Sequence, residues 1–206
     1  MYPEHRHKYI IEEAYSLFTR YGIRGMTMDA ISQNLGISKK TLYKHIRNKE
    51  KLLNQVFAYI EMQVMGRIGQ LEKEEMNAID VLIKMSIIAV DHHKTINPVI
   101  LSELTRFYPK TYADYLDNKK RLIVGFIKNN LEKGIKERLY RPDLNKELVA
   151  LLYYQNIDEL HKMVYQNNLP FEEIFEVMFE NHIRAIANKK GIQYLEREKK
   201  GILNFQ

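Results

Sequence analysis

Apolar side chains recur at intervals of three and four residues along most of the chain, the spacing that places them on one face of an α-helix. No stretch keeps the strict alternation of apolar and polar residues that is typical of a half-buried strand. The few glycines and prolines stand mostly between the periodic stretches, where they begin or end helices. The pattern predicts an all-α protein of about nine helices.

The first 50 residues predict three helices joined by short turns. A helix over residues 5–21 is ended by Gly22, and its apolar stripe consists of Ile10, Ala14, Leu17, Phe18 and Tyr21. A helix of about two turns follows Thr27, which stands where an N-cap is expected. Gly36 permits the positive φ of a tight turn, and Ser38 can cap a third short helix. Two short helices therefore pack across a very short turn.

A longer helix from about residue 48 connects this module to the rest of the chain. Prolines 98, 109, 142 and 170 divide the remainder. The helices expected there cover residues 77–94, 98–107, 110–137, 145–166 and 171–188. The tail after Gly191 either extends this helical body or frays. The pattern thus predicts one domain over 1–50 and a second, helical domain over 51–206.

Composition excludes several classes of protein. The chain of 206 residues is long enough for one or two domains. No apolar run approaches the roughly 20 residues needed to span a bilayer. Glu12 and Glu13 interrupt the apolar start, so we expect no secretory signal and a cytoplasmic protein without a membrane partner. The absence of cysteine excludes disulfides and thiolate metal sites.

The positive charge is concentrated near the start of the chain. The net charge is +6, and residues 1–50 hold nine basic side chains against five acidic ones, whereas the remaining residues hold 23 against 21. A local positive field favours a polyanionic partner such as nucleic acid. A solvated surface with an excess of lysine is the alternative.

Two short helices joined by a glycine turn, after a supporting first helix, form the helix-turn-helix arrangement, whose second helix enters the major groove of double-stranded DNA. Leu42 and Ile46 lie one turn apart and face the core, so the polar residues of the third helix cover its outer faces. Lys39, Lys40 and Thr41 are the candidates for reading base edges, and Tyr43 and His45 for contacting phosphate. Alternatively, Tyr43 is a surface tyrosine that covers apolar neighbours.

The segment YGIRGMTMDAISQNLGISKKTLYKHIRNKEKLL, residues 21–53, resembles the DNA-binding segment of the tetracycline-repressor (TetR) family of bacterial transcription regulators. The shared pattern comprises the Gly22 turn, Thr27 at the start of the second helix, the Gly36-Ile37-Ser38 turn, Thr41-Leu42-Tyr43, and Asn48-Lys49-Glu50. The resemblance implies base readout by Lys39, Lys40 and Thr41, and phosphate contacts from Thr27, Tyr43, His45 and Lys49.

The same resemblance implies that helices five to seven enclose a small-molecule pocket and that helices eight and nine form a dimer. Aromatic and methionine side chains that fall in the pocket region are Met85, Phe107, Tyr108, Tyr112, Phe126 and Tyr154. They favour an apolar or aromatic effector, although helix-packing residues have the same composition. The last two long helices carry more apolar surface than one core contact requires. Their candidate dimerisation residues are Leu152, Leu160, Ile174, Met178 and Ile186.

The predicted function is therefore a homodimeric repressor that binds a palindromic operator and is released by a small molecule. No cofactor is expected. We expect no metal either, because the neighbours His92 and His93 point about 100° apart on a helix. Two alternatives remain. One is a helical enzyme using Asp158, His161 and His182, and the other is an interaction module with a basic docking surface. No phosphate-binding loop or nucleophile signature supports the enzyme.

Overall fold

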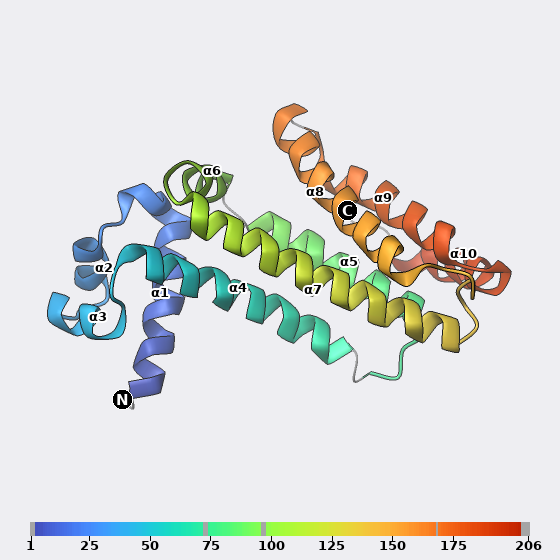
Figure 1. The fold of residues 1–206 in the computed structure, drawn as a ribbon, viewed down its shortest axis with the longest axis horizontal. Coiled ribbons are helices and arrows are strands. Elements are labelled where there is room, and N and C mark those ends of the chain that lie inside the picture. Colours follow the sequence, from blue (N-terminus) through green and yellow to red (C-terminus); the bar gives the residue numbers. More distant parts are fainter. Residues whose placement is uncertain (1–2, 72–73, 96–97, 168, 203–206) are drawn as a thin grey trace. The chain divides into compact units, whose positions relative to one another are not determined.

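The computed structural model describes residues 3–71, 74–95, 98–167 and 169–202, and over these ranges the chain is helical (Figure 1). Ten helices are present in the described part of the chain. Their bounds are α1 Pro3–Gly25, α2 Met28–Asn34, α3 Lys39–His45, α4 Lys49–Leu71, α5 Ala78–Thr95, α6 Pro98–Phe107, α7 Pro109–Lys136, α8 Lys146–Asn167, α9 Phe171–Ile186 and α10 Lys189–Ile202.

The all-α prediction is confirmed, and the helix bounds follow the periodic pattern closely. The helix predicted over 98–107 has those bounds, and α5, α7, α8 and α9 lie within two residues of the predicted spans. α1 runs past the predicted end, but Gly22 interrupts it with φ 74° and ψ 167°. The tail forms α10 as far as Ile202, which resolves the two alternatives for this segment in favour of a helix. Across the described ranges, no helix combines the length and the apolarity needed to cross a bilayer.

The helices form two compact packing units. The first unit consists of Met1–Met65 with Thr95–Lys119, and the second of Gly66–Lys94 with Lys120–Gln206. The first unit therefore holds α6 and the start of α7 as well as α1 to α3 and most of α4. The predicted domain boundary near residue 50 separates the helix-turn-helix segment from the rest of the sequence. It does not coincide with the division into packing units. The two domains, 1–50 and 51–206, stay a prediction.

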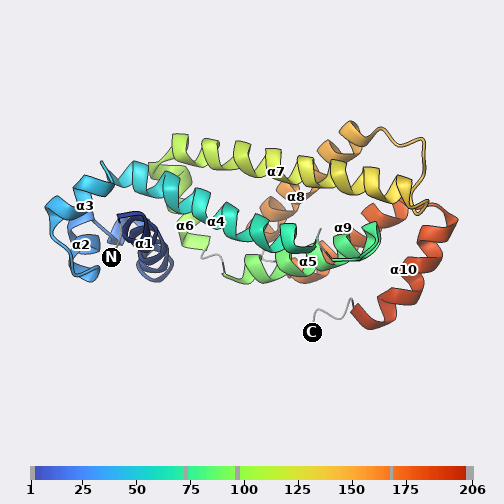
Figure 2. The ribbon, with the colours of Figure 1, turned by 90° about the horizontal axis from the view of Figure 1, so that it is seen from below.

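One hydrophobic core holds the first unit together. α1 packs against α6, and α2 packs against α3 (Figures 1 and 2). The core takes side chains from five helices and the link after α1, and its members include Ile10, Phe18, Ile23, Ile31, Leu42, Leu52, Val56, Phe57, Ile100 and Leu104. The two α6 residues, Ile100 and Leu104, are 7% and 0% exposed. The helix-turn-helix segment thus shares its interior with a helix that lies about 60 residues later in the sequence.

The second unit contains a buried hydrogen-bond network around Tyr140. The Tyr140 hydroxyl donates to Asn130 Oδ1 at 3.0 Å, and Asn130 Nδ2 donates to the Ala78 carbonyl at 2.8 Å. The Glu137 carboxylate accepts the Ala78 amide hydrogen at 2.8 Å. Gly134 lies beneath the Tyr140 ring, where a Cβ atom would come within 2.0 Å of ring carbon Cδ2. The network connects α5 to the end of α7.

α8 packs against α9, and two polar side chains meet inside this pair. The Tyr153 and His182 rings lie 4.4 Å apart between centroids. Burial lowers the pKa of His182 to about 4 and raises the pKa of Tyr153. Both groups are therefore uncharged at neutral pH, and this contact places no charge in the interior.

α10 is fixed to the second unit by its cap, Asn188. The Asn188 side chain accepts the Gly191 amide hydrogen at 3.1 Å and donates to the carbonyls of Arg138 and Tyr140. A short antiparallel bridge joins Tyr140 to Ala187. The Asn188 cap pairs a backbone N–H group at the start of α10 that would otherwise lack a partner within the helix. This helps the polar α10 segment to remain helical.

Candidate nucleic-acid interface

Capping side chains fix the ends of α2 and α3. The Thr27 hydroxyl oxygen accepts the Ala30 amide hydrogen at 3.1 Å, and Ser38 Oγ accepts that of Thr41 at 3.1 Å. Gly36 between the helices adopts φ 63°, a conformation that favours glycine. Each cap is worth about 1 kcal/mol. Such short helices need this help, because isolated helices of about two turns are unstable in water.

The inward faces of α2 and α3 are apolar and fully packed. Ile31 of α2, Leu42 of α3, and the C-cap residues of the two helices, Leu35 and Ile46, are between 0% and 8% exposed. The predicted orientation of α3 is therefore confirmed. Because Leu42 faces inward, the other faces of α3 carry mainly polar residues.

The outward side of α3 is basic and aromatic. Lys39, Lys40, Lys44 and Tyr43 are exposed, and about half of the Tyr43 surface is accessible. Arg47 follows immediately and is also exposed. Lys44 and Arg47 were not among the predicted contacts, although their charge and place in the sequence could have indicated them. Basic groups on one helical face offer several donors to phosphate and base acceptors.

Two of the predicted base-reading residues already have partners within the helix-turn-helix. The Lys39 ammonium forms an ion pair with the Asp29 carboxylate of α2. The Thr41 and Ser38 hydroxyls are 2.8 Å apart and hydrogen-bonded. A DNA contact from Lys39, which stays a prediction, would require its ammonium to leave the Asp29 carboxylate. Exposed ion pairs of this kind contribute only about 0.2–1 kcal/mol, so breaking this pair costs little.

His45 lies at the C-terminal end of α3, near the start of α1. Its ring is 6.2 Å from that of His7 between centroids. Desolvation lowers the pKa of His45, and the positive charges of His7, Arg6 and Lys44 lower it further. A neutral imidazole can still donate one hydrogen bond to phosphate. A nearby phosphate would favour the protonated ring.

Lys49 at the start of α4 is directed toward the protein. Its ammonium donates to the Ile23 carbonyl, and burial lowers the pKa of Lys49 while Glu103 partly counters this shift. Glu103 of α6 accepts the amide hydrogens of Ile23 at 2.6 Å and Arg24 at 3.0 Å. Both side chains thus hold the stretch from the Gly22 kink to the start of α2, which is the link between the two helices. Sequence reasoning missed Glu103, and a phosphate contact from Lys49 stays a prediction.

Residues 10–56 match the family described as bacterial regulatory proteins, tetR family. This match spans most of α1, the capped helix pair and the first residues of α4. The chain carries the DNA-binding segment of the TetR family. It is therefore a DNA-binding transcriptional regulator of the helix-turn-helix class, and the alternative of a helical enzyme is set aside, because the family consists of regulators.

Relatives extend the similarity of this TetR-family chain beyond the match. The uncharacterized HTH-type transcriptional regulator YhgD of Bacillus subtilis is 25% identical over 151 residues, which are 71% of this chain and 78% of YhgD. The HTH-type transcriptional repressor KstR2 of Mycobacterium tuberculosis is 24% identical over 143 residues, 68% of this chain and 72% of KstR2.

A solved structure shows the same fold. A protein of Saccharomonospora viridis assigned as a transcriptional regulator, solved in complex with choline, superposes with a TM-score of 0.70 at 17% identity and covers 90% of this chain and 100% of its own.

The six predicted pocket residues fall in different surroundings. Phe107 is exposed, and the guanidinium groups of Arg24 and Arg106 lie 4.8 Å and 5.3 Å from its ring centroid. Tyr108 and Tyr112 pack against the core of the first unit, while Met85, Phe126 and Tyr154 are buried residues of the second unit. Three of the six residues therefore belong to each unit. A pocket formed by these residues stays a prediction.

The five predicted dimerisation residues also divide. Leu152 is 62% exposed, and Ile174 and Met178 are half-buried. Leu160 and Ile186, at 3% and 1% exposed, are buried within the second unit, and their part in a dimer stays a prediction. Periodicity alone could not separate the two faces, because both faces of these helices are apolar.

His93 and His161 of the second unit make ring contacts. The His93 ring stacks on that of Phe171 at 3.6 Å between centroids, and the His161 ring lies 5.6 Å from His93. His161 Nδ1 is 2.7 Å from the Ile157 carbonyl oxygen. Among the described residues, no three histidine or carboxylate side chains are grouped so that they could hold a metal ion.

Proposed function

We propose that this TetR-family regulator is a homodimeric repressor that binds a palindromic operator and releases it when a small molecule binds. The observation that carries the proposal is the exposed basic face of α3, which is fixed by two caps and a packed inner face. A rigid helix of this kind can present side chains to the major groove in one register. The relative KstR2 is itself a repressor, which supports repression over activation.

We assign different DNA contacts to different residues of the interface. Lys39, Lys40 and Thr41 in the first turn of α3 read bases, and Lys44 and Arg47 join Thr27, Tyr43 and His45 as phosphate contacts. Lys40 is exposed and lies beside Lys39, whose ammonium is paired with Asp29. Lys40 is therefore the sharper test of base readout.

Lys40→Ala is expected to weaken operator binding by about 1–3 kcal/mol and to relax the preference at one base pair. The operator is first obtained by selecting bound sequences from a random DNA pool, and affinity is then measured across salt concentrations. Lys44→Ala should lower the affinity for all DNA sequences by the same factor. It should also reduce the slope of log affinity against log salt concentration by about one. Lys190→Ala on the exposed start of α10 is the charge-matched control and should change neither quantity. Equal, weak affinity of the unmodified protein for every duplex would refute specific DNA binding.

Exposed apolar residues on α8 and α9 support a dimer. Leu148 and Leu152 lie one turn apart on α8 and are 56% and 62% exposed, and Val177 on α9 is 61% exposed, beside the half-buried Ile174 and Met178. Neighbouring exposed apolar residues favour a protein interface. A two-fold dimer matches two copies of α3 to half-sites about 34 Å apart.

Leu152→Glu is expected to shift the protein from dimer to monomer, because it places a charge in the proposed apolar contact. Sedimentation velocity measures the change, and operator affinity should fall with it, since half-sites are then bound singly. Met62→Glu alters an exposed apolar residue of α4 in the first unit and should leave the dimer intact. A wild-type protein that stays monomeric at micromolar concentration would exclude this arrangement.

The contacts within the first unit suggest how a ligand could alter DNA binding. Glu103 of α6 and Lys49 of α4 both hold the link between α1 and α2. A ligand that displaces α4 or α6 would therefore move α2 and α3, and the two copies of α3 would no longer match the half-sites. Coupling of this kind is typically worth about 1–3 kcal/mol. The choline complex of the Saccharomonospora viridis protein supports a small-molecule effector.

A further inference from the structure

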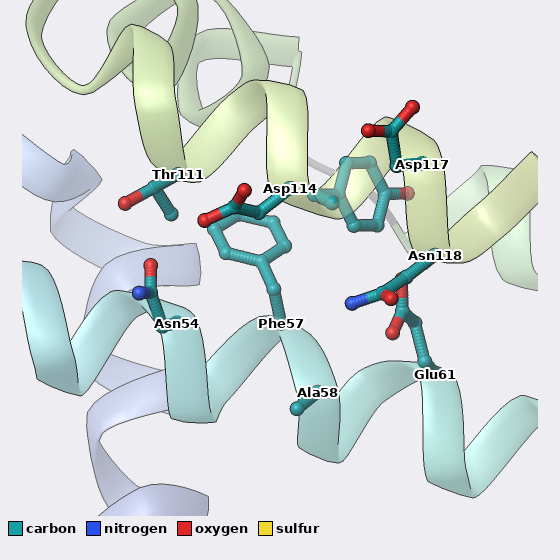
Figure 3. Close-up of a pocket in the computed structure, with 9 residues that line it drawn as sticks. Asn54, Phe57, Ala58, Glu61, Thr111, Asp114, Asp117 and Asn118 are labelled. Carbon is teal, nitrogen blue, oxygen red and sulfur yellow. The ribbon is translucent and has the colours of Figure 1, made fainter.

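A cavity of about 320 Å³ lies within the first unit between α4 and the start of α7. In Figure 3 Asn54, Phe57 and Glu61 point from α4 toward α7, and Thr111 and Asn118 point from α7 toward α4. Asn54, Phe57 and Glu61 line it from α4, and Thr111, Asp114 and Asp117 are among the lining residues from α7. The volume is sufficient for a small organic molecule.

The lining is acidic although the protein is basic overall. Glu61, Asp114 and Asp117 are carboxylates, and the residues that line the cavity include no lysine, arginine or histidine. The chain as a whole carries a net charge of +6. Asp114 and Asp117 are both exposed to solvent. A hollow lined by charges of one sign concentrates ions of the opposite sign. The electrostatics therefore favour a cation.

Two polar atoms inside the cavity lack hydrogen-bond partners among the described residues. The Thr111 side chain is buried, with the residue only 2% exposed, and its Oγ has no partner. Asn54 Oδ1 also has none. In Figure 3, Thr111 and Asn54 face each other from opposite sides of the cavity. Buried polar atoms are nearly always paired, so these two atoms favour a ligand that can hydrogen-bond to them. The amide oxygen can only accept, which means that the ligand has to donate.

Aromatic rings form part of the wall. The Phe57 and Tyr115 rings lie 5.0 Å apart between centroids, and both residues line the cavity. The face of an aromatic ring attracts a cation by about 0.5–2 kcal/mol. A metal ion would gain little from such a wall, and within the described ranges these carboxylates do not form a metal-binding group. The combination of rings, carboxylates and acceptor oxygens suits an organic ammonium ion.

We infer that this cavity binds a small organic cation with several N–H donors, a primary diamine or polyamine. Its ammonium groups would donate to the Asp114 carboxylate and to Asn54 Oδ1, with Thr111 Oγ as a further acceptor, and the exposed Asp117 carboxylate nearby would add to the attraction for a cation. The inference rests on the proposed ligand-controlled function, because it identifies this cation as the effector. The effector class differs from the apolar or aromatic one that the composition of the sequence favoured.

Phe57 connects the cavity to the DNA-binding helices. Its side chain lines the cavity and also belongs to the core that holds Ile31 and Leu42. At 6% exposed it has little free space. A ligand that shifts Phe57 therefore disturbs the packing beneath α2 and α3, since close-packed interiors transmit small displacements.

Calorimetric titration of the full chain with putrescine, in the absence of DNA, tests the inference. We expect one site per chain. The double variant Asp114→Asn/Asp117→Asn should bind about tenfold more weakly, the loss expected for one charge-assisted hydrogen bond. Thr111→Val should also weaken binding while leaving the unfolding curve unchanged or shifted to higher denaturant, because it removes an unpaired hydroxyl without changing the volume. Asp143→Asn/Glu173→Gln removes two exposed carboxylates outside the cavity and should bind like wild type.

Two further titrations distinguish a built site from surface charge. Tetramethylammonium lacks N–H donors, and Mg²⁺ gains little from contact with the aromatic rings. Both ions should therefore bind at least about tenfold more weakly than putrescine at equal ionic strength. Equal binding of either ion, or unchanged binding by the Asp114→Asn/Asp117→Asn variant, would overturn the inference.

The effector role is tested by measuring how putrescine changes the operator affinity of wild type and of the variant. Putrescine should weaken the DNA affinity of wild type more than that of Asp114→Asn/Asp117→Asn, and the variant accounts for any direct action of the amine on DNA. Binding without this difference would refute the effector role. Operator binding without putrescine is measured separately. If putrescine does not bind the cavity, the DNA-binding proposal is therefore unaffected. If the protein does not bind an operator specifically, the putrescine titration still stands.

Discussion

Replacing Glu103 by alanine is expected to lower the free energy of unfolding by about 2–3 kcal/mol and to weaken operator binding. The carboxylate accepts two backbone amide hydrogens, those of Ile23 and Arg24, at a link where Gly22 already adopts a conformation with φ 74°. Without it, both donors lose a charged acceptor in a partly buried place. The α1–α2 link then becomes free to move, and α3 follows it.

Chemical denaturation and operator titration measure the two effects of Glu103→Ala. Glu103→Gln keeps one acceptor oxygen without the charge and should lose about half as much stability. Glu13→Ala removes an exposed carboxylate of α1 and is the control, expected to lie within about 0.5 kcal/mol of wild type. Operator binding is compared at a temperature where every variant is folded. An affinity unchanged in Glu103→Ala would show that this bond does not position the DNA-binding helices.

Gly134→Ala is expected to destabilise the protein by about 3 kcal/mol, although alanine favours helix formation. The added Cβ would lie 2.0 Å from Cδ2 and 2.2 Å from Cε2 of the Tyr140 ring. Tyr140 is only 1% exposed, and its hydroxyl is held by Asn130. The ring cannot move aside without breaking the hydrogen-bond network that ties α7 to α5.

Gly125→Ala on the same helix is the matched control for Gly134→Ala. A Cβ at Gly125 meets nothing within 4 Å, so this change should stabilise α7 by up to about 1 kcal/mol. Thermal unfolding followed by circular dichroism should give opposite shifts for the two variants, with a fall of roughly 10 °C for Gly134→Ala. Shifts of the same sign would show that the Tyr140 ring accommodates the methyl group.

The helical architecture and the orientation of α3 were predictable because both depend on local spacing. Apolar residues three and four apart fix the buried face of each helix, and Leu42 was expected in the core, where it is 0% exposed. Capping by Thr27 and Ser38 was equally local. Such signals need no knowledge of which helices meet.

Contacts between distant residues were not predictable from the same patterns. Glu103 lies 80 residues from Ile23, and nothing near either residue indicates the bond. The Lys39–Asp29 ion pair depends on how α2 and α3 cross, and the acidic cavity depends on the meeting of α4 with α7. Whether the tail forms a helix was uncertain from the sequence, because α10 is rich in polar residues and the cap that Asn188 provides was not recognised.

The interior that α6 shares with α1 bears on attempts to transplant this DNA-binding segment into another protein. A fragment ending after α4 would lose Ile100 and Leu104, and would leave the α1 surface that they cover open to water. It would also lack the carboxylate that secures the first interhelical link. A portable version of the segment must therefore carry α6 with it, or replace the uncovered apolar surface of α1 with polar side chains.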